Sequence, residues 1–293
     1  MNKAEKQALI GIPIILLVAV GLAFAGSQGS YQAFGLPIFA IGVALAFLIQ
    51  WVVFIPSFLK RTEAYFDLTG GLTYITVVVV AVLLRPSVGA RALLLLGMIS
   101  IWAIRLASFL FRRVRAVGED RRFREMKQSF TRFLLTWTLQ GLWVSFSLAA
   151  ALAAITSVVS VELGLFALAG FLVWLLGFGI EVIADRQKDA FRVDPENAGK
   201  FIKDGLWSWS RHPNYFGEIV LWIGVAIVAI PTLNGWQWVT LISPLFVVLL
   251  LTRISGVPML EARADEKWGG QAEYEEYKAR TSVLIPRPPT DRE

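Results

Sequence analysis

Long apolar segments dominate this chain, and they restrict its possible folds more than any other feature of the sequence. A helix of about 20 apolar residues is long enough to cross a bilayer. Eight such segments are predicted, at residues 8–25, 34–55, 71–84, 90–111, 133–154, 163–183, 216–230 and 236–257. Each is expected to be helical, because backbone groups inside a bilayer must be hydrogen-bonded within the protein. The pattern predicts an all-α polytopic membrane helix bundle of about eight transmembrane helices, with seven as the alternative.

The positions of the basic residues orient these helices. Of the 28 Lys and Arg residues, 25 fall in terminal segments and loops on one side of the predicted membrane. Arg85 and Arg91 are the two on the other side, and Arg105 lies within the fourth segment. Cytoplasmic loops of membrane proteins carry the excess of Lys and Arg. We therefore expect both termini to be cytoplasmic, and a seven-helix arrangement would break the alternation.

The first apolar segment has a second interpretation. It follows Lys3 and Lys6 and ends in Ala23-Phe24-Ala25, which resembles a signal-peptidase site. It is long for the apolar region of a signal peptide, so a retained first helix is expected and a cleaved signal is the alternative.

Composition excludes several classes of site. The chain has no Cys and a single His, which rules out thiol catalysis and argues against a zinc or di-iron centre, so no metal is expected. Basic residues lie beside apolar segments, and no base-reading module is present, so no nucleic-acid partner is expected. The glycine-rich dinucleotide and P-loop patterns are also absent. Any nucleotide would have to bind the helices and their cytoplasmic loops.

The stretch Asp204–Glu218, DGLWSWSRHPNYFGE, concentrates polar groups at the predicted membrane edge. Pro213 suits the first turn of a helix, where its missing N–H costs nothing. The free N–H groups at a helix start, with Arg211 and His212 beside them, favour an anion such as phosphate. An interfacial anchor is the alternative.

Helical spacing groups further residues of this stretch. Arg211, Asn214 or Tyr215, and Glu218 are expected on one face of the helix. Glu218 is expected to lie inside the bilayer, where a carboxylate must be paired, protonated or bound to a ligand.

Two other cytoplasmic segments carry candidate ligand groups. Asp185 and Arg192, seven residues apart, share a helix face, where they can bind ribose and phosphate or simply form a solvated helix end. Arg253 ends the last span. Beyond it, a charged segment containing Glu261, Tyr277 and Arg280 is predicted to form two short helices separated by Gly269-Gly270. As a charge run, that segment is more typical of a solvated face.

The N-terminal half contributes fewer polar candidates. Arg105 inside the fourth span needs a partner or a cavity, and Glu181 and Glu218 are candidate partners. Glu63 and Tyr65 lie between the second and third spans. With Asp67 they could line the mouth of a cavity, while a turn before Gly70-Gly71 would explain Asp67 and Thr69 equally well.

Three segments resemble the C-terminal domain of the steroid 5-alpha-reductase family, nearest to its bacterial branch of DUF-type membrane proteins. They are DPENAGKFIKDGLWSWSRHPNYFGEI, TRISGVPMLEAR and EYEEYKARTSVLIPRPP. The upstream pieces FDLTGG, IWAIRL and GEDRRF fit the same branch. The Arg-His-Pro-Asn-Tyr element is also similar to sterol C14-reductases and, in shortened form, to isoprenylcysteine carboxyl methyltransferases.

This resemblance implies an NADPH-dependent reductase in a bacterial inner membrane that transfers hydride to a conjugated C=C of a lipid-like enone. It implies N-terminal membrane helices over residues 1–132 and a cofactor-binding domain over 133–293. The cofactor residues it implies are Asp185, Arg192, Arg211, His212, Asn214, Tyr215, Glu218, Arg253, Tyr277 and Arg280.

The catalytic end departs from the family. Trp102, three residues before Arg105, stands where a proton-donating Tyr is expected. Arg105, Glu63 and Tyr65 are therefore the catalytic candidates, and Tyr74 is a further one. A methyltransferase that uses S-adenosylmethionine and a non-catalytic lipid-binding protein remain the alternatives.

Overall fold

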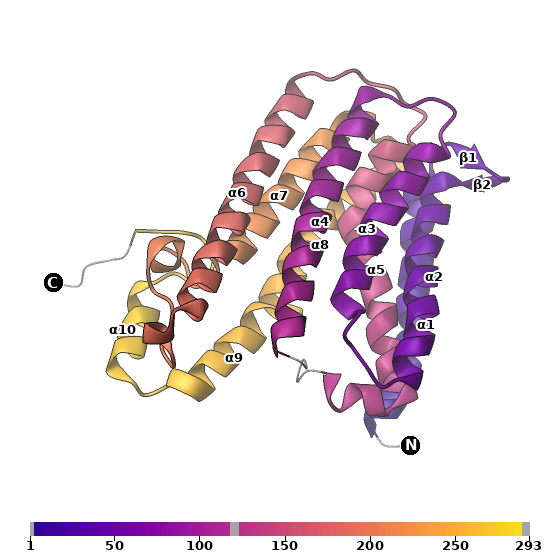
Figure 1. Cartoon of the computed structure of the whole chain (residues 1–293). Helices are drawn as coiled ribbons and strands as arrows, with labels where there is room; N and C mark the ends of the chain where they lie inside the picture. Colours follow the sequence, from indigo (N-terminus) through magenta and orange to yellow (C-terminus); the bar gives the residue numbers. More distant parts are fainter. Residues whose placement is uncertain (1–2, 118–122, 289–293) are drawn as a thin grey trace. The chain divides into compact units, whose positions relative to one another are not determined.

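A computed structural model describes residues 3–117 and 123–288 of the chain, without the side chains of 112–117. The described residues contain eight helices long and apolar enough to span a membrane, which confirms the predicted fold class. Figure 1 shows their order along the chain. The chain divides into two compact units, one of residues 1–168 and 226–243, the other of 169–225 and 244–293. These units do not test the functional division predicted at residue 132, which stays a prediction. The motif GEDRRF lies largely outside the described residues.

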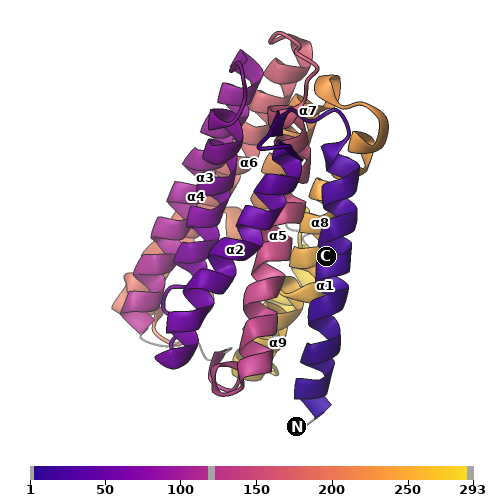
Figure 2. The ribbon, with the colours of Figure 1, turned by 90° about the vertical axis from the view of Figure 1, so that its right-hand side faces the viewer.

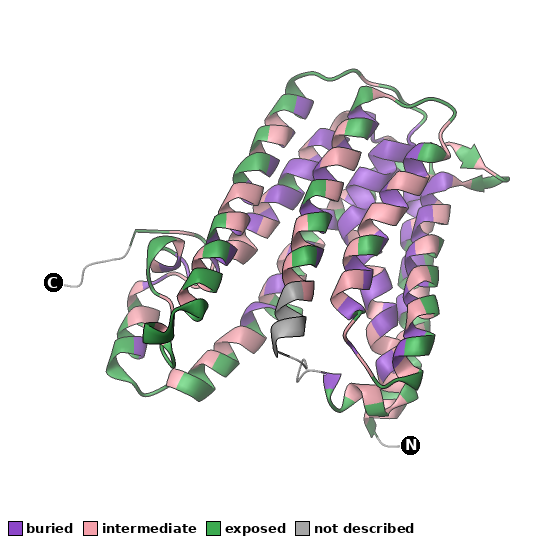
Figure 3. Ribbon diagram, viewed as in Figure 1, coloured by how far each residue is buried: buried purple, intermediate pink, exposed green. Residues whose placement is uncertain are grey.

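The first unit is a helix bundle. Its elements are α1 (Lys3–Ser27), β1 (Gln32–Ala33), β2 (Leu36–Pro37), α2 (Ile38–Leu59), α3 (Phe66–Leu83), α4 (Ala90–Val117) and α5 (Phe130–Thr156). Helix α5 contacts α1, α2, α3 and α4, and its second half is buried without interruption from Ser147 to Thr156. Figure 2 shows α2 and α5 running side by side. The helices carry exposed residues along their length (Figure 3). Many large apolar side chains are among the exposed residues, and Phe24 is 79% exposed. An exposed apolar surface of this extent suits contact with lipid.

The second unit holds α6 (Leu165–Val193) from residue 169 on, most of α7 (Pro213–Ala229), α8 (Ile242–Leu249), α9 (Val257–Trp268) and α10 (Ala272–Arg280). Pro213 begins α7, as predicted. The two short helices predicted after the last span are also confirmed, and Gly270 between them has a φ of 81°, a left-handed conformation that glycine adopts without strain.

Two boundaries differ from the sequence prediction. The last span is not one regular helix: a 3-10 segment (Gly235–Leu241) precedes α8, and a π-helical segment (Leu250–Ile254) follows it. Asp67 and Thr69 lie inside α3 together with Gly70 and Gly71, so the alternative that a turn holds Asp67 and Thr69 is wrong. Helix α3 begins earlier because Phe66 packs its ring against Trp137, with ring centroids 5.2 Å apart.

Glycines allow α6 and α7 to approach at backbone distance. A Cβ on Gly217 would lie 2.6 Å from the backbone nitrogen of Glu181, and one on Gly224 would lie 2.5 Å from that of Trp174. Small residues at such spacings let membrane helices pack closely. This close packing brings the polar side chains of α6 and α7, such as Asp185 and Asn214, within hydrogen-bond distance of each other.

The substitution Gly217→Ala is expected to destabilise the protein by roughly 1–3 kcal/mol, because the added methyl group overlaps the α6 backbone. Gly179→Ala on α6 is the matched control, since its Cβ would meet no atom within 4 Å. Alanine favours a helix over glycine by about 1 kcal/mol, so the control should be neutral or slightly stabilising. Melting temperatures measured in detergent separate the two; equal shifts would contradict the close packing.

Candidate functional site

A pocket of about 470 Å³ opens in the second unit between the end of α6, the loop that follows it, α9 and α10. We call it the basic pocket. Its cationic lining residues are Lys188, Arg192, Lys200, Arg211, Arg263 and Lys267. Its aromatic lining residues are Phe191, Phe201, Trp207, Trp268, Tyr274 and Tyr277. Cations together with aromatic faces suit a ligand that combines phosphate groups with a planar base.

The aromatic wall is centred on Phe201. Its ring centroid lies 5.8 Å from that of Trp268, 5.3 Å from that of Tyr274 and 5.4 Å from that of Tyr277. The Tyr277 hydroxyl donates to the carbonyl of Trp207 at 2.8 Å, which ties α10 to the loop. A backbone bond from Arg211 to Ser282 adds to this attachment. The wall is therefore fixed in place by contacts between segments far apart in the sequence.

The opposite wall is built on the carboxylate of Glu261. Arg211 Nη2 lies 3.1 Å from one carboxylate oxygen, and His212 Nε2 lies 2.7 Å from the other. Both basic residues precede α7, so the expectation that Arg211 shares a helix face with Asn214 and Glu218 is wrong. The helix begins at Pro213, which leaves Arg211 free to turn toward α9. The carboxylate of Glu261 thus contacts Arg211 and His212, the two basic residues that the sequence analysis expected to bind an anion such as phosphate.

Two buried polar atoms of this wall have no hydrogen-bond partner among the described residues. They are Arg211 Nε and His212 Nδ1. Burial is the main cause that lowers the pKa of His212, so its ring is neutral near pH 7. A carboxylate only accepts, so Nε2 carries the proton and Nδ1 is an acceptor. Two residues of the lining therefore carry one buried donor and one buried acceptor that are both unused, and buried polar groups of this kind are costly when they stay unsatisfied.

His212 also predicts a pH dependence of stability. Burial lowers its pKa below 6.5, the Glu261 carboxylate opposes the shift, and Lys188 and Arg211 add to it. The unfolded chain takes up a proton near pH 6.5 while the folded protein resists it, so stability is full above that pH and is lost as the pH falls toward the folded-state pKa. The melting temperature should decrease as the pH is lowered from about 7.5 to about 5.5. The fall should be smaller in His212→Gln; an equal fall in the variant would contradict this origin.

The remaining cofactor candidates lie at different distances from this pocket. Asn214 Nδ2 donates to Oδ1 of Asp185 at 3.1 Å, which joins the first turn of α7 to α6, and Asp185 is 5% exposed. Tyr215 stacks on His212 with ring centroids 5.7 Å apart and an angle of 11°. Glu218 lies half-buried one turn further along α7. These residues continue the site from the basic pocket along α7.

Like Asp185, Asn214, Tyr215 and Glu218, the last two candidates are not among the residues that line the basic pocket. Arg253 is exposed on the π-helical segment after α8. Arg280 lies 2.6 Å from Glu276 of its own helix and lines a smaller hollow of about 200 Å³. Arg192 and Tyr277, in contrast, do line the basic pocket.

The three catalytic candidates lie in the first unit. Glu63 is buried and its carboxylate lies 2.8 Å from Lys127 Nζ. Tyr65 is 51% exposed, and the Arg105 guanidinium lies 5.4 Å from the ring centroid of Phe109. Trp102 is buried, with its ring edge-to-face with Tyr74 at 5.1 Å. Tyr74 thus places a phenol against Trp102.

Sequence reasoning missed several of the lining residues. Glu261 was assigned to a solvated charge run, yet it is half-buried between Arg211 and His212. Lys200 and Phe201 lie in a loop without periodicity, where no helical spacing reveals them. The usable signal was aromatic: Trp268 and Tyr277 interrupt a charged segment that has no other reason to carry large rings.

Comparisons with known proteins find one family model and several relatives that are similar to this chain. A family model described as protein of unknown function, DUF1295, matches residues 53–281. A rat 3-oxo-5-alpha-steroid 4-dehydrogenase 1 is 30% identical over 41% of this chain and 40% of its own length. The steroid 5-alpha-reductase DET2 of Gossypium hirsutum is 29% identical over 41% of each. The match thus spans about two-fifths of the length of these relatives. No solved structure matches the chain.

Proposed function

The chain belongs to the DUF1295 family, and from this membership and the geometry of the basic pocket we propose that it is an NADPH-dependent membrane reductase. The substrate is a lipid-like molecule, such as a steroid or isoprenoid enone, whose conjugated C=C is reduced. The proposal rests on relatives that are named as steroid 5-alpha-reductases and dehydrogenases. The protein acts in the bacterial inner membrane with both termini in the cytoplasm.

The observation that carries the proposal is the unsatisfied pair of Arg211 Nε and His212 Nδ1 within a pocket of cations and aromatic rings. A phosphate oxygen accepts from the first, and a ribose hydroxyl donates to the second. The rings of Phe201 and Trp268 meet at 65°, and the face of either ring suits stacking on the adenine. The residues present therefore fit a dinucleotide phosphate.

Other residues are assigned by position. Arg192, Arg263 and Lys267 hold phosphates, including the 2′-phosphate that distinguishes NADPH from NADH. Asn214 and Glu218 orient the nicotinamide carboxamide further along α7. Bound NADPH supplies the hydride for the β carbon of the enone.

The protein's own groups supply the rest of the reaction. Arg105 stabilises the negative charge that develops on the carbonyl oxygen. A proton then reaches the neighbouring carbon, so that one hydride and one proton add across the double bond. We assign its donation to Tyr74, beside Trp102, in preference to the exposed Tyr65. Glu63, held by Lys127, positions its loop in this scheme.

Purified protein tests the proposal. NADPH should raise its melting temperature more than NADH or S-adenosylmethionine does, and a bacterial lipid extract or a steroid enone should accelerate NADPH oxidation. Stabilisation by S-adenosylmethionine alone would favour a methyltransferase. Binding of NADPH without oxidation by any lipid extract would leave a non-catalytic lipid-binding protein.

A further inference from the structure

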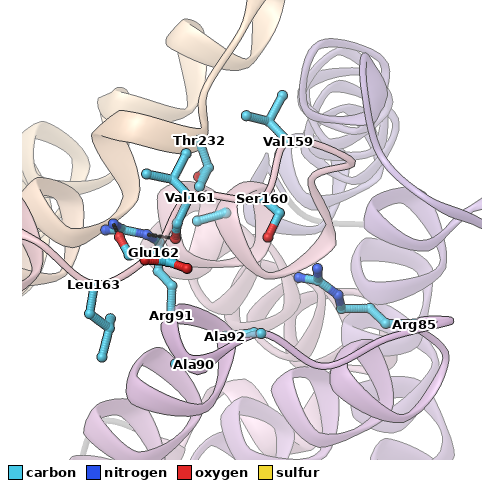
Figure 4. Close-up of a pocket in the computed structure, with 12 residues that line it drawn as sticks. Arg85, Ala90, Arg91, Ala92, Val159, Ser160, Val161, Glu162, Leu163 and Thr232 are labelled. Atoms are coloured by element: carbon cyan, nitrogen blue, oxygen red, sulfur yellow. Dashed lines mark hydrogen bonds between the residues drawn. The ribbon is translucent and has the colours of Figure 1, made fainter.

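A second pocket, of about 480 Å³, lies in the first unit and is separate from the basic pocket. The α3–α4 connection, the start of α4, the α5–α6 connection and Thr232 line it. We call it the arginine pocket. Figure 4 shows the guanidinium groups of Arg85 and Arg91 approaching it from opposite sides, with the Ser160 hydroxyl directed toward the space between them.

Both arginines are held in place by neutral groups. Arg91 is 5% exposed and donates to the carbonyls of Val228 and Glu162 at 2.7 Å each, and to that of Val161 at 3.3 Å. Arg85 donates to the carbonyls of Ser87 and Ile155 and lies 5.2 Å from the ring centroid of Tyr31. Their geometry is thus fixed before any ligand arrives.

Their positive charges are not neutralised by the protein. Within residues 3–117 and 123–288, no carboxylate lies within ion-pair distance of Arg85 or Arg91. Burial is the main cause that lowers the pKa of Arg85, and the charge and hydrogen bond of the Tyr31 side chain oppose the shift. A partly buried charge without a counter-ion is costly, and a bound anion removes that cost.

The sequence reinforces this placement. Arg85 and Arg91 are the two basic residues that the charge count assigns to the non-cytoplasmic side, and both line one pocket. Lys and Arg are scarce in non-cytoplasmic loops of membrane proteins. Two arginines that line one pocket on that side therefore indicate a specific role there. Apolar side chains flank the same opening, among them Leu163, which is 50% exposed and lines the pocket.

We propose that the arginine pocket binds a phosphate group at the non-cytoplasmic face of the membrane, supplied by an anionic phospholipid headgroup or by soluble phosphate. Arg85 is the main contact, since it is only half-buried, while Arg91 is 5% exposed and donates from all three guanidinium nitrogens to backbone carbonyls. Ser160 adds a hydroxyl donor. Glu162, an exposed carboxylate in the lining, weakens the site by repulsion.

Titration of the purified protein in neutral detergent tests this site. Phosphatidylglycerol, phosphatidylcholine and inorganic phosphate are added separately at constant ionic strength, and the melting temperature gives the apparent affinity. Phosphatidylglycerol should stabilise the wild type and bind about 10-fold more weakly to Arg85→Gln, the loss expected for one charge-assisted hydrogen bond. Arg61→Gln, an exposed arginine outside the pocket, is the matched control and should bind as the wild type does.

The second variant works in the opposite direction. Glu162→Gln removes the repelling charge and should bind phosphatidylglycerol severalfold more tightly, a gain that misfolding does not produce. Stabilisation by phosphatidylglycerol but not by inorganic phosphate assigns the group to a lipid, and stabilisation by both assigns it to any phosphate. The proposal is overturned if neither probe stabilises the wild type more than phosphatidylcholine does, or if affinity is the same in wild type, Arg85→Gln and Glu162→Gln.

Discussion

Replacing Arg211 by Gln is expected to weaken NADPH binding by about 100-fold, which corresponds to about 2.7 kcal/mol. The side chain of Arg211 is 12% exposed, contacts Glu261 at 3.1 Å, and lines the basic pocket with its Nε unpartnered. The substitution removes a charge-assisted bond to phosphate, of roughly 1.5–3 kcal/mol. It also removes the positive charge that pairs with the Glu261 carboxylate, so this carboxylate repels the phosphates of NADPH more strongly. NADPH fluorescence titration of the detergent-solubilised protein measures the change.

Two further variants separate this effect from a general loss of charge. Arg287→Gln removes an exposed arginine that does not line the basic pocket, and its NADPH affinity should match that of the wild type. Arg211→Lys keeps the charge but loses the planar guanidinium, so it should fall between the wild type and Arg211→Gln. Unchanged affinity in Arg211→Gln would remove the basic pocket from the account.

Replacing Asn214 by Ala is expected to abolish measurable NADPH binding. Asn214 Nδ2 donates to the buried Asp185 at 3.1 Å, and this bond fixes the first turn of α7 against α6. The substitution removes this hydrogen bond to a carboxylate, which contributes roughly 1.5–3 kcal/mol. It also removes the side-chain amide that is proposed to orient the nicotinamide carboxamide. Glu218→Ala should give the same loss of binding, because Glu218 follows Asn214 by one turn of α7.

The control for this prediction is Asp189→Asn. Asp189 is an exposed residue on the same helix as Asp185, outside the basic pocket, and its variant should bind NADPH normally. Isothermal titration with each protein, after a melting curve confirms folding, compares them. Normal affinity in both Asn214→Ala and Glu218→Ala would confine the site to the loop and α9–α10.

The fold was predictable because lipid imposes length and polarity on each span. The eight spans followed from apolar length alone, and Pro213 marked the start of α7. The π-helical segment at Leu250–Ile254 was not predictable, since an inserted residue leaves the hydropathy unchanged.

The site was predictable where its residues are close in sequence. Asp185 and Arg192 both lie on α6, as their spacing predicted, and their role in a site stays a prediction. The bond between His212 and Glu261 joins residues 49 positions apart, and spacing rules extend only a few turns. Arg211 was misplaced for a related reason: helical spacing was counted through Pro213, where the helix begins.

The structure of the protein with NADPH bound, determined in lipid nanodiscs, tests the central claim most directly. The account predicts density for the adenosine and phosphate groups in the basic pocket, against Phe201 and Trp268 and within reach of Arg211, with the nicotinamide extending toward Asn214. Density for NADPH at any other place, or an empty basic pocket at saturating NADPH, would contradict it.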